Sequence, residues 1–391
     1  MQSRIHLKDI LDPVDEATFF REYWAEKPLV VNTHNRARFD GLFDLDDLEQ
    51  YLFIARPPAG DVQLVRSGQL PPLAMVSGLI KESSYDVQAV YNGLSAGFTV
   101  VLNAVHFRWP AARRLTIELE DLLRARVQTN VYITGHRGQG FAVHQDDHDV
   151  FVLQTCGSKR WTIYERPDAA SPAAPRVLHQ IELKSGDALY LPIGYPHSAE
   201  TSDDYSIHVS VGLFPMTWQE FARDCLTLAA MKDPRWREPI PLAVVRGEAP
   251  PPAIADVERR IHESFSMLTD LSPVLSSHAR TLSATSHRRN PPPSGYAESI
   301  RAAESLAGTA EIERRPGVGC YVTASGDTAA IHFMGETMRA PAKAEKALRF
   351  IAGHVRFRIN EIDDALLEES KVVLVRRLIR DGLLQRAGEG D

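Results

Sequence analysis

The sequence predicts a mainly β protein that continues into a helical region and a mixed C-terminal module. Up to about residue 216, runs rich in β-branched and aromatic residues alternate with Gly, Pro and Asp turns, as in VQTNVYIT, VFVLQTC and YSIHVSVGLF. Such runs are typical of an antiparallel sandwich or barrel. From Met216 the pattern becomes helical, and the Pro-rich segment HRRNPPPSG near residue 290 is typical of a linker. We therefore expect three domains, residues 1–216, 217–290 and 291–391.

Composition agrees with a globular protein of this size. The chain has 391 residues, 44 Lys and Arg against 51 Asp and Glu, and a formal charge of −7. Its first residues lack the apolar core of a signal peptide, and no run approaches the roughly 18 apolar residues of a membrane span. We expect a soluble, cytoplasmic protein without a membrane partner. The three cysteines are too far apart for a close pair, which disfavours a disulfide framework or a thiolate zinc site.

The first domain is expected to open with a short amphipathic helix. The segment ATFFREYWAEKPLVV places four aromatic residues at helical spacing before Pro28, which stops the helix. A strand, Leu29 to Val31, follows it.

The second domain is expected to hold two principal helices. Thr217 and Glu220 form a capping-box pattern at the start of TWQEFARDCLTLAAM, and DVERRIHESFSMLTDL is a second helical pattern. Their apolar stripe comprises Phe221, Leu226, Ile261, Phe265 and Leu268. Because so few helices cannot enclose a core, the stripe predicts a homodimer, with packing on the chain's own barrel as the alternative.

The third domain is expected to be of winged-helix type. GVGCYVTAS and TAAIHFMG are strand-like, and helix patterns follow over residues 343–353, 359–370 and 370–384, the last with Ser370 as N-cap and Gly382 as stop. From Pro341 to Asp391 there are 10 basic and 9 acidic residues, a net charge of +1. A DNA-reading helix needs more positive charge, so we do not expect DNA binding.

The strongest chemical signal is a set of two histidines and a carboxylate. His144 and Asp146 are two residues apart in GFAVHQDDHDVFVLQTCGSKRW, so on a strand they share a face. His197 follows a turn-and-strand segment about fifty residues later. Two His and one carboxylate that leave coordination positions open are the facial triad of non-haem Fe(II) oxygenases. His148 and Asp149 are alternative ligands, and residue parity alone does not exclude His148.

Lys159 is the candidate anchor for a cosubstrate. It lies fifteen residues after His144, and its ammonium group could pair with the distal carboxylate of a 2-oxoglutarate molecule that chelates the metal. Arg160 competes for this role, because strand alternation lets only one of the two face inward.

With these residues the sequence resembles the JmjC/cupin-4 family of 2-oxoglutarate oxygenases, in its bacterial ribosomal-oxygenase-like branch. The matching segments are FFREYWAEKPLVV, NVYIT, HQDDHDVFVLQTCGSKRWTIY and GDALYLPIGYPHSAE. The resemblance implies a double-stranded β-helix (the cupin/JmjC jelly roll), then a helical dimerisation region and a C-terminal winged-helix domain. It places the iron ligands on His144, Asp146 and His197, and the carboxylate partner on Lys159.

The resemblance also implies cosubstrate contacts for Asn130 and, more weakly, Ser210. It predicts an Fe(II)- and 2-oxoglutarate-dependent dioxygenase that uses O₂ to hydroxylate an amino-acid side chain in a protein or peptide, ribosomal proteins being the precedent. Asp rather than Glu as the carboxylate ligand favours hydroxylation over demethylation. The segment 165–176, rich in Pro and Ala, departs from the pattern and is expected to be a surface loop.

Two alternatives from other classes stay open. One is a cupin-type zinc or manganese isomerase or hydrolase that does not use 2-oxoglutarate, and the other is a small-molecule sensor with a DNA-binding module. A biosynthetic peptide or a free amino acid is the alternative substrate of a hydroxylase.

Overall fold

The computed structural model divides the chain into two compact units, residues 1–215 and 216–391. The predicted domain boundary near residue 216 lies beside this division, whereas the one near residue 290 lies outside the described residues. The structure describes residues 5–33, 35–58, 60–66, 80–81, 84–135, 138, 142–167, 176–248, 251–266, 268–271, 273–275, 277–279, 281–282, 296–315, 318–334, 336–362 and 365–387.

The first unit combines a large sheet with short helices. The helices are α1 (Leu7–Leu11), α2 (Glu16–Glu22), α3 (Leu45–Gln50), η1 (Tyr51–Ala55), α5 (Val87–Ser95), η2 (Val105–Phe107) and α6 (Pro110–Leu123). The strands are β1 (Leu29–Val31), β2 (Val62–Val65), β3 (Ile80–Lys81), β4 (Ser84–Tyr85), β5 (Thr99–Leu102), β6 (Arg126–Gly135), β7 (Asp149–Tyr164), β8 (Val177–Lys184), β9 (Ala188–Leu191) and β10 (His197–Phe214). The predicted strand is confirmed as β1, and the predicted N-terminal helix is present as α2, but it ends at Glu22 rather than at Pro28.

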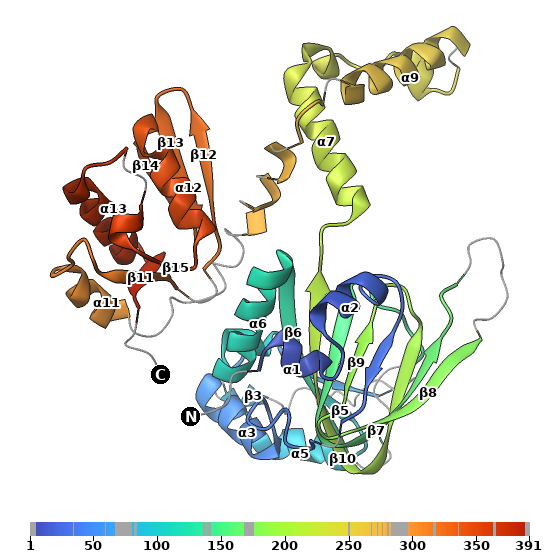
Figure 1. The fold of residues 1–391 in the computed structure, drawn as a ribbon. Helices are drawn as coiled ribbons and strands as arrows, with labels where there is room; N and C mark the ends of the chain where they lie inside the picture. Colours follow the sequence, from blue (N-terminus) through green and yellow to red (C-terminus); the bar gives the residue numbers. More distant parts are fainter. Residues whose placement is uncertain are drawn as a thin grey trace. The chain divides into compact units, whose positions relative to one another are not determined.

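The eight-stranded sheet has the order β1-β9-β7-β10-β6-β5-β2, with β8 also paired to β7, and every pairing is antiparallel. The first half of β7 pairs with β9 and its second half with β8, while β10 runs along both halves. The two long central strands, β7 and β10, thus run through both parts of a curved sheet (Figure 1). The predicted antiparallel barrel or sandwich is confirmed.

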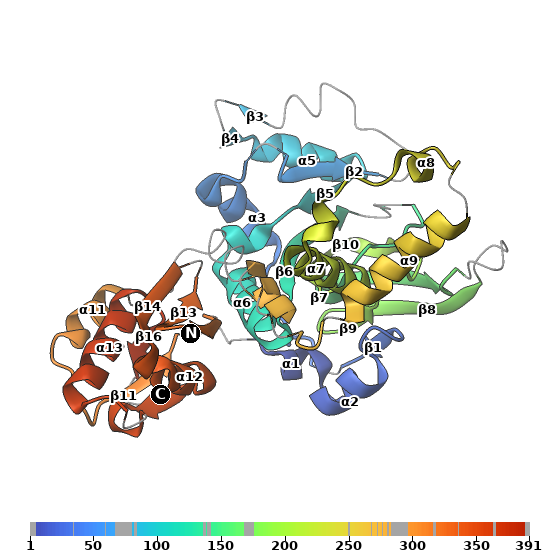
Figure 2. The same ribbon diagram turned by 90° about the horizontal axis from the view of Figure 1, so that it is seen from above.

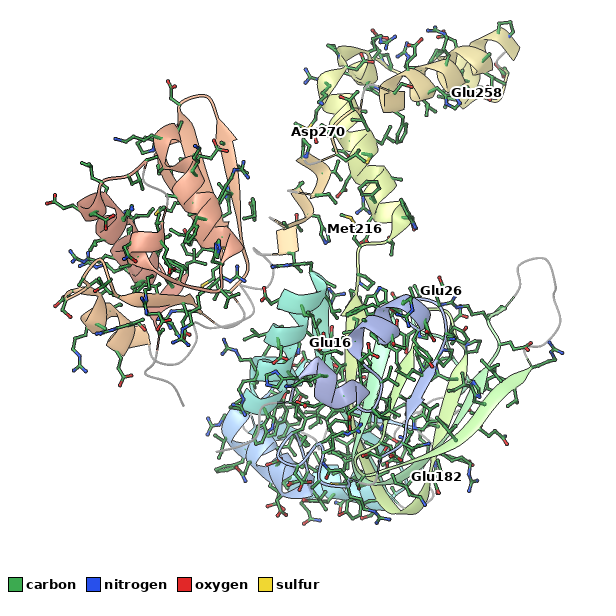
Figure 3. All side chains as sticks on the ribbon, in the orientation of Figure 1. Glu16, Glu26, Glu182, Met216, Glu258 and Asp270 are labelled. Atoms are coloured by element: carbon green, nitrogen blue, oxygen red, sulfur yellow. The ribbon has the colours of Figure 1, made fainter. Side chains whose placement is uncertain are left out.

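Both faces of the first half of β7 are buried, for different reasons. Phe151 and Leu153 belong to the main core under the N-terminal helices. Val150 and Val152, one residue out of phase, belong to a smaller core with Trp161 inside the curve of the sheet. A strand buried on both faces has a continuous apolar run rather than alternation, as VFVL does. The acidic residues labelled Glu16, Glu26 and Glu182 lie on the outside of this unit (Figure 3).

Aromatic packing attaches the first helices to the sheet. The ring of Phe19 in α2 lies 4.9 Å from Tyr190 of β9 and 5.6 Å from Phe151 of β7. The Tyr190 hydroxyl donates to Asp149 Oδ2 at 2.6 Å and accepts the Ala25 N–H at 2.9 Å. On another side of the sheet, α6 packs along β6, as both views show (Figures 1 and 2).

The second unit begins with helices. They are α7 (Trp218–Lys232), η3 (Pro234–Arg237), α8 (Leu242–Val245) and α9 (Pro251–Ser266). The capping box of Thr217 and Glu220 is confirmed, because the side chain of each accepts the other's backbone N–H. Only Cys225 and Ala229 of α7 are buried among its described residues. Among the described residues, no helix of the protein is long and apolar enough to cross a membrane.

Residues 296–387 have their own hydrophobic core. The elements are α11 (Tyr296–Ala303), β11 (Glu311–Arg314), β12 (Cys320–Ser325), β13 (Thr328–Phe333), β14 (Glu336–Pro341), η4 (Ala342–Ala344), α12 (Glu345–Gly353), β15 (Arg356–Arg358), η5 (Ile359–Glu361), α13 (Glu368–Arg380) and β16 (Leu384–Arg386). The strands form two small antiparallel sheets, β15-β11-β16 and β12-β13-β14. The winged-helix assignment of this region stays a prediction.

The helix predicted over residues 359–370 is wrong. The N–H groups of Ile359 and Asn360 donate to the carbonyls of Ala310 and Gly308, so the backbone here turns toward another segment. Among the described residues of this segment, η5 is the only helical turn before α13, whose N-cap is Leu367 rather than Ser370. The predicted stop at Gly382 is confirmed by its N–H, which donates to the Ile379 carbonyl at 3.1 Å.

Candidate metal centre

Backbone pairing brings the two histidines of the sequence motif together. His144 forms an isolated antiparallel bridge with His197, and each N–H donates to the other's carbonyl, at 3.1 and 2.8 Å. The segment that carries Asp146 is held against the same loop, because the Gly194 N–H donates to the Asp146 carbonyl at 3.3 Å. Residues about fifty positions apart in the chain therefore share one site.

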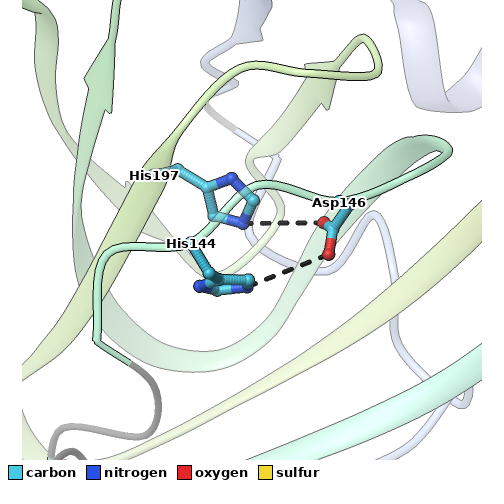
Figure 4. A group of neighbouring side chains, drawn as sticks. All are labelled: His144, Asp146 and His197. Carbon is cyan, nitrogen blue, oxygen red and sulfur yellow. Dashed lines mark ion pairs between the residues drawn. The ribbon is translucent and has the colours of Figure 1, made fainter. Parts of the chain in front are cut away.

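The three side chains converge as metal ligands would. One ligand atom from each of His144, Asp146 and His197 lies within 4.8 Å of the others. The Nε2 atoms of His144 and His197 lie 3.9 and 3.6 Å from the two Asp146 carboxylate oxygens (Figure 4). This arrangement has room for one cation between three donors.

Hydrogen bonds set the tautomer of both histidines. His144 Nδ1 lies 2.9 Å from the Ala142 carbonyl and His197 Nδ1 lies 3.0 Å from the Tyr195 carbonyl. Because a carbonyl only accepts, each Nδ1 carries the proton and each Nε2 lone pair is directed at the shared site. Burial lowers the pKa of His197, which keeps its imidazole neutral and able to bind a metal.

The two alternative ligands make other contacts in the structure. The ring of His148 is stacked 4.2 Å from Phe214, and its Nδ1 lies 2.8 Å from Asp147 Oδ1. Asp149 is buried and accepts from the Tyr190 hydroxyl and the Ile193 N–H, so its oxygens hold the fold.

A pocket opens beside the three convergent residues. It is lined by Thr99, Tyr132, His144, Asp146, Val150, Val152, Lys159, Trp161, Leu191, His197, Ala199, His208 and Ser210. The side chain of His197 is only 7% exposed, whereas that of His144 is 40% exposed. The candidate metal centre therefore lies between a buried interior and the surface.

Lys159 faces this pocket and Arg160 does not. Lys159 is 3% exposed, and its Nζ donates to Thr134 Oγ1 at 3.1 Å. Arg160 lies on the opposite face of β7, where it pairs with Glu200 at 3.2 Å. Burial lowers the pKa of Lys159 to about 7. The deep pocket thus holds an amine that an anionic ligand would convert to an ammonium.

Asn130 and Ser210 were the two further candidates for contact with the cosubstrate. They are cross-strand partners, because Ser210 of β10 pairs with Asn130 of β6. Ser210 lines the pocket. The Asn130 amide oxygen instead accepts from the Ala104 N–H at 2.9 Å and from Gln128 Nε2 at 3.2 Å, so it supports the neighbouring backbone. Their cosubstrate contacts stay predictions.

Sequence reasoning missed His208, Tyr132 and Trp161. The rings of His208 and Tyr132 stack at 4.8 Å with 1° between their planes, and Trp161 meets His208 edge-on at 5.5 Å. Strand parity could have found His208, because it lies two residues before Ser210 and so on the same face of β10. Burial, with Lys159 nearby, holds the pKa of His208 well below its ordinary value.

The segment that carries this fold and the three convergent residues matches a known domain family. Residues 104–221 match the JmjC domain family. The β-rich unit therefore contains a JmjC domain, and a mainly β jelly roll of the cupin/JmjC type is confirmed.

Among curated proteins, the chain is similar to proteins named as ribosomal oxygenases. It is 28% identical over 292 residues to mouse Ribosomal oxygenase 2, covering 67% of this chain and 59% of that protein. It is 29% identical over 223 residues to the bifunctional lysine-specific demethylase and histidyl-hydroxylase NO66 of Drosophila persimilis, covering 53% of this chain and 31% of that protein. The chain thus spans less than two thirds of the length of these relatives.

A solved structure extends the likeness of fold to nearly the whole chain. The ribosomal oxygenase YcfD of Escherichia coli in complex with cobalt and succinic acid matches with a TM-score of 0.56 and 18% identity, over 96% of this chain and 99% of that one. A complex of YcfD with cobalt and 2-oxoglutarate matches with a TM-score of 0.54.

Proposed function

We propose that this protein is an Fe(II)- and 2-oxoglutarate-dependent dioxygenase that hydroxylates an amino-acid side chain in a protein or peptide. The observation that carries the proposal is the convergence of His144, Asp146 and His197 at the mouth of a pocket whose interior holds the buried amine of Lys159.

The donor set fits iron. Two neutral imidazoles and one carboxylate on one side of a cation leave positions open for other ligands, which is the arrangement of non-haem Fe(II) oxygenases. His144, Asp146 and His197 would hold the metal, with both Nδ1–H groups anchored on carbonyls so that the Nε2 atoms stay in position.

The pocket fits 2-oxoglutarate. Lys159 would pair with the distal carboxylate, and Asn130 and Ser210 are the further candidate contacts. Val150, Val152 and Leu191 line the same pocket and would exclude water from it. When bound, iron and 2-oxoglutarate supply the oxidative chemistry, with O₂ as the oxidant, while the chain binds, orients and shields.

The relatives support a protein substrate. One is named as a ribosomal oxygenase and another as a histidyl-hydroxylase. We infer that the substrate is a side chain of a protein or peptide, with a ribosomal protein as the first candidate, and that the enzyme acts in the cytoplasm.

Turnover of 2-oxoglutarate tests the proposal. The purified protein with Fe(II), ascorbate and O₂ should convert 2-oxoglutarate to succinate, and His144→Ala should abolish the conversion and weaken Co(II) binding. His148→Ala is the matched control and should keep both. Metal binding without any 2-oxoglutarate binding would instead identify a cupin-type metalloenzyme of another kind. Mass spectrometry of ribosomal proteins, searching for one added oxygen, then tests the substrate.

We further infer a homodimer formed through the helices of the second unit. Their described residues leave apolar side chains uncovered: Trp218 is 85% exposed, Met231 73% and Val245 68%. Ile261 and Phe265 of the predicted stripe are 41% and 40% exposed. Apolar area of this extent on a few helices supports association with another copy.

A further inference from the structure

The loop between β9 and β10, residues 192–196, contacts two of the three candidate metal ligands. Its Gly194 N–H donates to the Asp146 carbonyl at 3.3 Å, and its Tyr195 carbonyl accepts the Nδ1–H of His197, with 3.0 Å between the two heavy atoms. A displacement of this β9–β10 loop would therefore move ligand atoms of the metal centre.

Side-chain packing does little to hold the middle of the β9–β10 loop. Ile193 is 40% exposed, and Gly194 has a φ of +82° and open space where a side chain would lie. The Ile193 N–H, however, donates to Oδ1 of Asp149 at 2.7 Å. Because the two residues are adjacent, the Asp149 carboxylate also fixes the position from which the Gly194 N–H reaches Asp146.

Asp149 is itself fixed in the core. It is 1% exposed at the start of β7, and its Oδ2 accepts the Tyr190 hydroxyl at 2.6 Å. That hydroxyl accepts the Ala25 N–H at 2.9 Å, and the Tyr190 ring packs 5.1 Å from the ring of Phe151. A carboxylate whose two oxygens both accept hydrogen bonds in a packed interior keeps one position. Asp149 is thus a rigid support behind the loop.

We propose that Asp149 is a positioning residue of the metal centre: by accepting a backbone N–H of the β9–β10 loop, it keeps Asp146 and His197 in ligand geometry. The inference rests on the proposed function, because it requires a metal bound by these residues and His144. Removing a group that orients metal ligands from behind typically weakens metal binding about 10- to 100-fold.

A purely structural role is the competing explanation, and Asp187 provides the comparison. Asp187 directly precedes β9, whereas Ile193 follows the end of that strand. Asp187 is 5% exposed, and its carboxylate accepts the N–H groups of Thr33 and Lys184 at 2.9 and 2.8 Å. Like Asp149, it therefore joins two donors in the buried part of the sheet, but at the end of β9 away from the candidate metal ligands.

The test compares three substitutions in the full chain, each titrated with Co(II). Asp149→Ala removes the acceptor of the Ile193 N–H, Asp149→Asn keeps an oxygen acceptor, and Asp187→Ala is the structural control. The Kd of Co(II) should rise about tenfold or more for Asp149→Ala and stay within about threefold of the unsubstituted protein for the other two. The visible absorption bands of bound Co(II), which report its coordination geometry, should change only in Asp149→Ala.

Two measurements on the metal-free protein complete the comparison. Both Ala variants should unfold at a lower temperature, because each leaves buried donors without an acceptor. Amide hydrogen exchange of residues 193–195 should be faster in Asp149→Ala than in Asp187→Ala, since only the first releases the loop.

The outcomes separate this inference from the proposed function. If the unsubstituted protein does not bind Co(II), both fail. If it binds Co(II) and Asp149→Ala binds it equally well with the same absorption bands, Asp149 serves the fold alone and only the inference fails. An equal loss of affinity in Asp187→Ala, or an Asn variant as weak as the Ala variant, would also overturn it. Should Asp149→Ala not fold, Asp149→Leu fills the space without an acceptor and is judged by the same Kd criterion.

Discussion

At the scale of single residues, Lys159 has the clearest conflict between function and stability. Its amine is buried, and among the described residues its hydrogen-bond partner is the neutral hydroxyl of Thr134. Burying an ammonium without an anion costs free energy, and this cost lowers the pKa from 10.5 to about 7. A residue kept at such a cost is expected to serve a ligand.

Replacing Lys159 with Met should therefore abolish 2-oxoglutarate binding and stabilise the ligand-free protein. Between pH 7 and 10.5 the unfolded chain holds a proton on Lys159 that the folded chain does not, so the stability of the unsubstituted protein rises with pH across this window. The advantage of Lys159→Met should accordingly be greatest below pH 7 and shrink toward pH 10. Thermal unfolding across this range measures it, with Arg160→Met as the exposed control. A variant less stable at every pH would contradict the argument.

The same amine should link cosubstrate binding to proton uptake. Above pH 7 the free pocket holds mostly neutral lysine, and pairing with a carboxylate requires the ammonium. The Kd of 2-oxoglutarate should therefore rise with pH above about 7, by up to about tenfold per pH unit. Calorimetry in buffers of different ionisation enthalpy should find close to one proton taken up near pH 8. Lys159→Arg, which stays charged, should show neither effect if it binds, and a pH-independent Kd in the unsubstituted protein would rule the linkage out.

At the scale of elements, β7, the strand that carries Lys159, changes partners along its length, from β9 to β8, while β10 pairs with both halves. The register between β7 and β10 shifts between the Thr201 and Ser206 pairs, at the point where Gly157 lies opposite Ser206. Gly157 has a φ of +65°, and a Cβ there would lie 2.0 Å from the Tyr205 carbonyl oxygen. Only glycine therefore fits this bend, which lies shortly before Lys159 in β7.

Substituting Gly157 with Ala should destabilise the first unit by about 2 kcal/mol or more, because the new methyl group meets backbone rather than a movable side chain. Urea unfolding measures the loss. Gly60→Ala is the matched control, since it has a φ of +96° but open space around it, and it should lose only the smaller conformational contribution. Equal losses in the two variants would show that the close approach to Tyr205 is not decisive.

Elements were predicted well where local pattern governs them and poorly where tertiary hydrogen bonds intervene. The Thr217 cap and the Gly382 stop are local features, and both are present. The segment 359–370 has a helical pattern, but the N–H groups of Ile359 and Asn360 bond to carbonyls about fifty residues earlier. No periodicity within the segment reports such distant acceptors.

At the scale of the whole molecule, the exposed apolar residues of the second unit predict a dimer. Ile261 and Phe265 both lie on α9 and remain exposed among the described residues. Replacing both with Lys should convert a dimer into a monomer by burying two charges in the proposed interface. Sedimentation at micromolar concentration should find a dimer for the unsubstituted protein and a monomer for the variant.

Val373→Lys is the control for this experiment. Val373 is 62% exposed on α13 and lies outside the proposed interface, so the variant should remain dimeric. A monomeric unsubstituted protein would remove the dimer proposal.

From residue patterns alone one could predict the strand-rich first domain, the set of two histidines and one carboxylate, and a cation, Lys159 or Arg160, shortly before Trp161. These depend on residue type, spacing and hydrophobic pattern, which are local properties. The folded structure was needed to place Lys159 rather than Arg160 at the pocket, to show the other contacts of His148 and Asp149, and to bring His208 into the pocket wall. Strand alternation assigns neighbouring residues to opposite faces, but which face is inside depends on how distant strands close around it.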